Sequence, residues 1–152
     1  MITFQEESFE DILEEFKGIH DLHWEEVELH QDKIPLDPDY EMYKLLDVKG
    51  ALHVMTARAD GEFIGYFISL IQHSLHHMST FYAISDLIFI HPDYRKGRVG
   101  YNLIKETEIA LTALGVDVIN MIFKIDKDME AIMKHSGFEK TEVMYSKYVG
   151  EL

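Results

Sequence analysis

Residues 81–123 restrict the possible folds of this chain more than any other stretch. Residues 81–90 form an apolar run typical of a buried strand, and residues 99–114 carry apolar side chains at helical spacing. Residues 116–123 are again rich in β-branched and apolar side chains and predict a second strand. A strand, a helix and a strand in this order form a parallel pair with a right-handed crossover. We therefore predict an α/β unit within a larger sheet.

The rest of the chain supplies further helices and an antiparallel hairpin, which makes the sheet mixed. Asp60 and Gly61 separate two runs rich in Val, Ile, Phe and Tyr, and both residues can adopt the positive φ of a tight hairpin turn. Ser8 can cap a helix that Gly18 would end. The other predicted elements are helices over residues 8–18, about 20–30, 40–46 and 126–135, strands over 51–59, 62–72 and 141–149, and a polar connection over 73–79.

The composition predicts one globular domain over residues 1–152. A hydrophobic fraction of 47% is ordinary for a globular protein, and no apolar run approaches the length of a membrane span. The absence of cysteine excludes disulfides, thiolate metal sites and a cysteine nucleophile. We therefore expect a cytoplasmic protein that does not associate with membranes.

Charge is distributed unevenly along the chain. The 28 acidic residues outnumber the 14 basic ones, and residues 1–41 hold 14 of the acids but only two bases, Lys17 and Lys33. This acidity argues against nucleic acid as a partner, because phosphate contacts need cations. It suits either a solvated surface or the attraction of a cationic substrate or a basic protein.

The loop before the helix over residues 99–114 is the main exception to this acidity. Arg95, Lys96 and Arg98 lie next to Gly97 and Gly100, just before or inside the first turn of that helix. Backbone N–H groups at a helix N-terminus bind phosphate well, and cationic side chains beside them add charge. We predict that this loop holds an anion.

Residues 95–100, Arg-Lys-Gly-Arg-Val-Gly, resemble the Arg/Gln-x-x-Gly-x-Gly/Ala loop of the GNAT superfamily of N-acetyltransferases, with Arg98 in place of the middle glycine. The predicted order of elements is similar to the GNAT fold over nearly the whole chain. The resemblance implies an α/β (α+β) fold, in which a mixed central sheet has helices on both faces and contains a splayed parallel strand pair. Resemblance to GNAT-type proteins of tailed bacteriophages rests on residues 24–26, 33–36, 50–53, 70–77 and 94–100.

The GNAT resemblance also implies a binding site for acetyl-CoA, in the splay between the strands over residues 81–90 and 116–123. Backbone groups of Ile88, Phe89 and Ile90 would pair with its pantetheine arm. The residues implied around the pyrophosphate are Arg95, Lys96, Gly97, Arg98, Val99, Gly100 and Tyr101.

Asp86 falls where GNAT enzymes often carry an acid, and it is the candidate general base. Burial among apolar neighbours would raise its pKa into a useful range. The alternative is an aspartate that is bonded only to the backbone or to a basic neighbour. Met133 stands where the family usually has a tyrosine as general acid, and Tyr145 on the last predicted strand is the candidate substitute.

The acceptor side is less sharply defined. Trp24 and Glu25 fall in the helical region that shapes the acceptor pocket in this family; Glu25 could hold a cationic amine, and Trp24 is equally suited to a core position. We expect His76 to line the substrate side of the cleft. With His73 and His77 it could bind zinc if the loop curled, but a connection between two strands offers no regular helix to hold that spacing, and we expect no metal.

The implied function is acetyl-CoA-dependent transfer of an acetyl group to a primary amine, by direct attack because no cysteine can carry the acyl group. The acceptor is either a small amine or the lysine or N-terminus of a protein. Two alternatives stay open: a catalytically weak acetyl-CoA-binding module, which Met133 suggests, and an acidic protein that binds a basic partner, which residues 1–41 suggest. The final strands of this fold often pair between subunits, so a homodimer is a further expectation.

Overall fold

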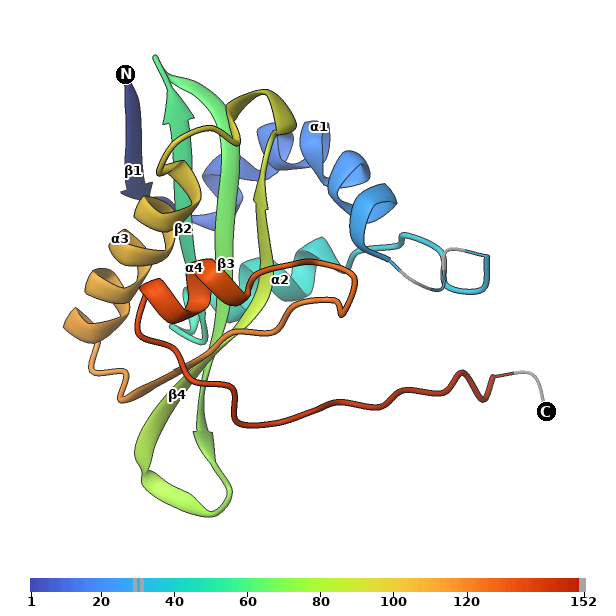
Figure 1. Cartoon of the computed structure of the whole chain (residues 1–152), viewed down its shortest axis with the longest axis vertical. Helices are drawn as coiled ribbons and strands as arrows, with labels where there is room; N and C mark the ends of the chain where they lie inside the picture. Colours follow the sequence, from blue (N-terminus) through green and yellow to red (C-terminus); the bar gives the residue numbers. More distant parts are fainter. Residues whose placement is uncertain (29, 31, 151–152) are drawn as a thin grey trace.

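The computed structural model describes residues 1–28, 30 and 32–150, and it shows a five-stranded sheet with helices on both faces (Figure 1). The strands lie in chain order; the first four are antiparallel neighbours, and the fifth is parallel to the fourth. This confirms the predicted mixed sheet. The elements are β1 (Ile2–Glu6), α1 (Phe9–Val27), α2 (Tyr40–Val48), β2 (Leu52–Ala59), β3 (Glu62–Ser74), β4 (His77–Ile90), the 3-10 helix η1 (Pro92–Tyr94), α3 (Val99–Ala113), β5 (Val118–Asn120) and α4 (Glu130–His135).

Each face of the sheet buries its own apolar cluster. On one face, α1 and α2 cover the strands, and Phe9, Ile12 and Phe16 of α1 are fully buried there. On the other face, Leu103 of α3 lies in a second cluster, against which Ile132 of α4 packs. Figure 1 shows the two pairs of helices on opposite sides of the sheet. The prediction of helices on both faces is therefore confirmed.

α1 is one continuous helix, whereas the sequence predicted two helices with a break at Gly18. Gly18 is exposed, and a Cβ atom at this position would meet nothing within 4 Å. The buried stripe of the helix continues from Phe16 to His20 and His23, four and seven residues further on. Packing of this stripe outweighs the cost of about 0.5–1 kcal/mol that a glycine imposes inside a helix.

β1 is an element that the sequence reading missed. Only Ile2 and Phe4 alternate with polar neighbours there, which is too short a pattern to stand out. The strand forms because β2 offers it an antiparallel edge from Ala59 to Met55.

The turns and strand lengths differ in part from the prediction. Asp60 and Gly61 have φ of 49° and 90°, which confirms the predicted hairpin turn between β2 and β3. The predicted connection over residues 73–79 is wrong, because β3 and β4 continue until only Leu75 and His76 separate them. β5 covers three residues of the predicted strand 116–123.

Residues 141–149 do not form the predicted strand. In the part of the chain that the structure describes, this segment has no neighbouring strand, and an isolated strand leaves its backbone groups without partners. Figure 1 shows it as an extended tail that leaves the body of the protein. Within the described residues, none of the helices combines the length and apolar character that a bilayer crossing requires.

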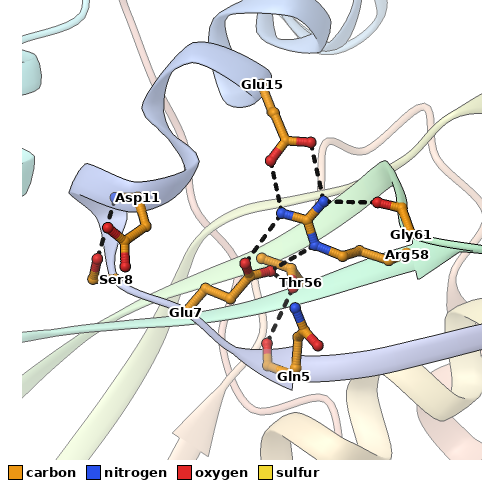
Figure 2. A network of polar contacts seen from close by, with 8 residues as sticks. All are labelled: Gln5, Glu7, Ser8, Asp11, Glu15, Thr56, Arg58 and Gly61. Atoms are coloured by element: carbon orange, nitrogen blue, oxygen red, sulfur yellow. Dashed lines mark hydrogen bonds and ion pairs between the residues drawn. The ribbon is translucent and has the colours of Figure 1, made fainter.

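A polar network fixes the start of α1 to the sheet (Figure 2). The guanidinium of Arg58 on β2 donates two hydrogen bonds to Glu7, at 3.0 and 3.1 Å, and two to Glu15 of α1, at 3.0 and 2.7 Å. Thr56 also donates a short hydrogen bond to Glu7. Burial of the Glu7 carboxyl favours a higher pKa, but the hydrogen bonds from Arg58 and Thr56 outweigh it and lower that pKa. This network therefore joins β2 to the start of α1 through both Glu7 and Glu15.

Candidate active site

β4 and β5 separate after a short parallel contact. They pair only from Tyr82 with Val118 to Ile84 with Asn120. The N–H of Ile122 then donates to the Ser85 hydroxyl at 2.8 Å, and beyond this point the chain leaves β4. β4 continues to Ile90 with only β3 beside it among the described residues. We call the resulting wedge beside residues 86–90 the splay; it presents unpaired backbone groups along one edge of β4.

Asp86 is the extra residue of a β-bulge at the start of the splay. Ser85 pairs with Ser69 and Leu87 pairs with Ile68, so Asp86 has no partner on β3. Its side chain is exposed, and one carboxylate oxygen accepts a hydrogen bond of 2.6 Å from the hydroxyl of Tyr43 on α2. The prediction that Asp86 is buried is wrong, because the bulge removes it from the inward alternation of its apolar neighbours.

The N-terminus of α3 lies directly after the basic loop. Its first intrahelical hydrogen bond runs from the N–H of Asn102 to the carbonyl of Arg98, so the three N–H groups of residues 99–101 have no partner within the helix. Among the described residues, no side chain caps this helix end, and its first turn holds no acid, whereas Ser8 and Asp39 cap α1 and α2. This helix end therefore keeps the full positive end of its dipole, which suits a phosphate.

The basic residues of the loop have two different roles. Lys96 and Arg98 are exposed, and the Arg98 guanidinium lies 4.6 Å from the centre of the Tyr101 ring. Arg95 instead donates from Nε to the Ile90 carbonyl at 2.7 Å and from its two terminal nitrogens to Glu26 of α1 at 2.9 and 2.7 Å. The hydrogen bond from Arg95 lowers the pKa of the Glu26 carboxyl. Arg95 thus ties the loop to α1, and Lys96 and Arg98 supply the accessible positive charge.

Gly97 and Gly100 shape this loop in different ways. Gly97 has a φ of 62°, a left-handed conformation that side chains other than glycine rarely adopt. At Gly100 a Cβ atom would lie 3.7 Å from a methyl of Ile132 and 3.8 Å from one of Ile90. The first turn of α3 therefore packs closely on α4 and on the end of β4, at the mouth of the splay.

A cavity of about 290 Å³ lies beside the C-terminal half of α1 and the start of α2; we call it the α1–α2 cavity. Tyr43 lines it and donates its hydroxyl to Asp86, so this one side chain links the cavity wall to the residue at the start of the splay. Burial and the bond to Asp86 raise the pKa of Tyr43, which keeps this hydroxyl protonated. The lining residues are His20, Trp24, Glu28, Ile34, Pro35, Leu36, Asp37, Pro38, Asp39 and Tyr43.

The structure brings only part of the predicted site together. Trp24 lines the α1–α2 cavity, but Glu25 is not among the lining residues. His76 lies in the turn of the β3–β4 hairpin, whose tip projects beyond the rest of the sheet (Figure 1). Tyr145 is 93% exposed on the tail, so within this chain the predicted general acid does not face the splay. Met133 packs against the apolar cluster under α3.

His20 and Tyr43 line the cavity, although the sequence reading assigned a role to neither. His20 follows Phe16 at a spacing of four positions, and this helical spacing is the signal that places His20 on the buried face of α1. Burial lowers the pKa of His20, although the charges of Asp21 and Asp86 oppose this effect.

A second cavity, of about 450 Å³, lies at the opposite end of β4 from the splay. It follows the edge of β2, where the side chain of His53 is 4% exposed and bonds to Glu6 through Nε2 at 3.1 Å. Its lining residues include neither a residue of the basic loop nor Tyr43, the hydrogen-bond partner of Asp86, so its larger volume does not make it the better candidate site. Among the described residues, no three histidine or acidic side chains gather closely enough to hold a metal ion.

A model of the acetyltransferase (GNAT) family matches residues 13–138. The structure is also similar to several solved structures. An aminoglycoside acetyltransferase from an uncultured soil metagenomic sample has a TM-score of 0.78 at 12% identity, covering 99% of both chains. A ribosomal-protein-alanine N-acetyltransferase from Brucella melitensis biovar Abortus 2308 has a TM-score of 0.69 at 15% identity, covering 100% of this chain and 99% of the other.

A third solved structure, an aminoglycoside N-acetyltransferase in complex with CoA, has a TM-score of 0.69 at 18% identity and covers 99% of this chain and 95% of the other. At these identities the three structures establish a shared fold. Comparison with curated proteins finds no match.

Proposed function

The chain belongs to the acetyltransferase (GNAT) family, and from this premise we propose that it transfers the acetyl group of acetyl-CoA to a primary amine held in the α1–α2 cavity. One observation carries the proposal. The bulge residue Asp86 stands where the splay begins, and Tyr43 joins it to the wall of the cavity at 2.6 Å. A co-substrate in the splay and an amine in the cavity would therefore meet at Asp86.

The residues around the splay fit acetyl-CoA, the co-substrate of this family. The edge of β4 at Ile88, Phe89 and Ile90 has no strand beside it among the described residues. The backbone groups that point to this edge, apart from the Ile90 carbonyl that Arg95 already bonds, can therefore pair with the amides of a pantetheine arm. The uncapped end of α3 suits a pyrophosphate, and Lys96 and Arg98 add positive charge. The residues proposed for this contact are Lys96, Gly97, Arg98, Val99, Gly100 and Tyr101, with Arg95 holding the loop in place.

The residues between the splay and the α1–α2 cavity can assist the transfer of the acetyl group. An alkyl ammonium has a pKa of about 10, so it must lose a proton before it attacks a thioester. The carboxylate of Asp86 is placed to hold this ammonium and to act as a base, since Tyr43 occupies only one of its oxygens. Backbone N–H groups on the free edge of β4 can stabilise the negative charge that develops on the carbonyl oxygen. The departing thiolate would take its proton from water, because Tyr145 is remote.

The lining of the α1–α2 cavity favours a small cationic amine as the acceptor. Glu28, Asp37 and Asp39 supply negative charge to its wall. The similar solved structures include enzymes named for aminoglycosides, which are small molecules, and one named for a ribosomal protein. We place a protein lysine or N-terminus second, because a cavity of about 290 Å³ accommodates a small molecule more readily than a folded chain.

Asp86→Asn should lower kcat/KM about 100-fold, the usual contribution of a general base, while acetyl-CoA binds unchanged. The measurement is the release of free thiol with a panel of mono-, di- and polyamines, alongside calorimetry with acetyl-CoA. Glu106→Gln on the exposed face of α3 is the matched control. Binding of acetyl-CoA without turnover of any amine would favour a binding module. A wild type that neither binds acetyl-CoA nor acetylates any amine would overturn the proposal and favour an acidic protein that binds a basic partner.

We also propose that two copies of the chain associate through the tail. The described residues place no strand on the outer edge of β5, and residues 143–145 are exposed on a segment that lacks a partner strand. Removal of residues 141–152 should therefore convert a dimer into a monomer in light scattering coupled to size exclusion. A full chain that is monomeric at all concentrations would refute the dimer.

The setting of the protein is proposed from the sequence. The absence of cysteine is in keeping with a cytoplasmic enzyme, where acetyl-CoA is available. The finer resemblance to proteins of tailed bacteriophages rests on short segments and stays a prediction.

A further inference from the structure

The C-terminal half of α1 contacts both substrate sites of the proposed reaction. His20, Trp24 and Glu28 recur at a spacing of four positions and line the α1–α2 cavity. His23 and Glu26 lie on a different side of the same helix, where they contact the end of β4 and the basic loop. One helix therefore lines the amine cavity and also holds the loop that we assign to acetyl-CoA.

Glu26 and Arg95 form a bidentate ion pair between α1 and the loop. The two terminal nitrogens of Arg95 donate to the two carboxylate oxygens of Glu26 at 2.9 and 2.7 Å, and its Nε donates to the Ile90 carbonyl at 2.7 Å. The guanidinium also lies 5.1 Å from the centre of the Phe89 ring, on which His23 stacks with 4.8 Å between ring centres. These contacts fix the orientation of Arg95 between α1 and the end of β4.

The last turn of α1 lacks a cation of its own. It holds Glu25 and Glu26 but no basic residue, and Glu28 follows as the C-cap, whose N–H donates to the Trp24 carbonyl. Carboxylates are unfavourable at the negative C-terminal end of a helix dipole, whereas cations are stabilising there. Arg95 supplies such a cation from outside the helix. It therefore stabilises the turn that places Trp24 and Glu28 on the cavity wall.

A phosphate on the loop would restrain the arginine that stabilises this turn. Arg95 directly precedes Lys96, the first of the residues proposed to contact the pyrophosphate, and the loop leads into the uncapped N-terminus of α3. Anchoring the loop at this helix end fixes the backbone that carries Arg95, and a fixed Arg95 restrains Glu26. Ligands on the loop and in the cavity therefore act on the same helix turn, and each reduces the entropy that the other loses in ordering it.

We propose that the Glu26–Arg95 pair couples the two substrate sites, so that coenzyme A on the basic loop strengthens amine binding in the α1–α2 cavity; this inference rests on the proposed acetyl transfer. Glu26 is then a positioning residue, which acts through Arg95 on one side and through α1 on the other. The coupling is reciprocal, so an amine in the cavity strengthens the binding of coenzyme A by the same factor. It favours the state in which both substrates are bound together.

Calorimetry with coenzyme A, which carries no acetyl group, measures this coupling without turnover. The second ligand is the amine that the wild type acetylates with the highest kcat/KM. Saturating coenzyme A should tighten the binding of this amine about 10-fold in the wild type but less than about twofold in Glu26→Gln. Arg95→Lys keeps the charge but loses the bidentate geometry, and it should also lose most of the coupling. Both variants should fold, because a partly exposed ion pair adds little to stability.

Glu15→Gln is the matched control. Glu15 also lies on α1, and its carboxylate oxygens accept two hydrogen bonds from Arg58 at 3.0 and 2.7 Å (Figure 2). This pair, however, joins the first half of the helix to β2. Glu15→Gln should therefore keep the coupling of about 10-fold, although it removes an ion pair of the same kind from the same helix.

Two results would overturn the inference directly: an amine affinity of the wild type that does not depend on coenzyme A, or wild-type coupling in Glu26→Gln. Equal loss of coupling in Glu15→Gln would also overturn it, since any weakening of α1 would then have the same effect. In each of these cases a wild type that acetylates amines leaves the proposed acetyl transfer intact. A wild type that binds no coenzyme A and acetylates no amine would refute both.

Discussion

Gly100→Glu should weaken the binding of acetyl-CoA at least about 100-fold, equivalent to about 2.7 kcal/mol. The substitution places a carboxylate in the first turn of α3, where the N–H groups of residues 99–101 lack helix partners and where we place the pyrophosphate. Two like charges a few ångströms apart repel strongly in a partly buried site. An acid in a first helical turn also stabilises the helix by about 0.3–1 kcal/mol, so the fold should survive.

Two variants separate charge from bulk at this position. Gly100→Gln has the size of the glutamate but no charge, and Gly100→Ala adds only a Cβ at ordinary contact distance from Ile132 and Ile90. Calorimetry should therefore rank their affinities for acetyl-CoA as alanine above glutamine above glutamate. Equal losses for glutamine and glutamate would show that the site excludes bulk and that no phosphate lies there. Wild-type affinity in the glutamate variant would remove the loop from the co-substrate site.

Gly65→Ala should lower the free energy of unfolding by about 2–3 kcal/mol, the range for forced overpacking. Gly65 lies on β3 opposite Ile90, and a Cβ there would be 2.5 Å from the Phe89 carbonyl oxygen and 3.1 Å from the Ile90 Cα. Both are backbone atoms of β4, so no side chain can move aside to relieve the contact. The end of β4 must shift instead, and it forms the edge of the splay. We therefore expect weaker acetyl-CoA binding together with the lost stability.

Gly18→Ala is the matched control, with the opposite expected sign. Gly18 lies within α1, and a Cβ there meets nothing within 4 Å. Alanine should raise the free energy of unfolding by about 0.5–1 kcal/mol, because glycine loses more backbone freedom on folding. Urea denaturation of both variants tests the pair. A Gly65→Ala protein as stable as the wild type would show that β3 and β4 separate at this point without cost.

Local signals account for the parts of the fold that the sequence predicted well. The turn at Asp60 and Gly61 depends on two residues that accept positive φ, and the ends of α3 and α4 depend on Gly115 and Gly137 in the same way. The order of strand, helix and strand over residues 81–123 predicts a parallel pair. The helix carries the chain back along the sheet, so the second strand starts at the same end as the first. Each of these features depends on residues close together in sequence.

The basic loop could also be predicted from residues that are close together in sequence. Its charge and its place before a helix can be read from residues 95–100, and they led to the family that the match over residues 13–138 then established. Helix dipoles and unpaired N–H groups act within one turn, so no distant contact is needed to predict them.

Only the tertiary structure decided the remaining features of the site, because they depend on residues far apart in the chain. Asp86 is exposed since β4 bulges against β3, and its partner Tyr43 lies 43 residues away. Arg95 is engaged by Glu26, 69 residues away, and its charge is therefore not free as the loop sequence suggested. A β-bulge and the pairing of side chains from distant elements leave no periodic trace in a sequence. The sequence by itself determined the family and predicted the anion loop, and the packing of α1 and α2 on the sheet decided which residues line the α1–α2 cavity.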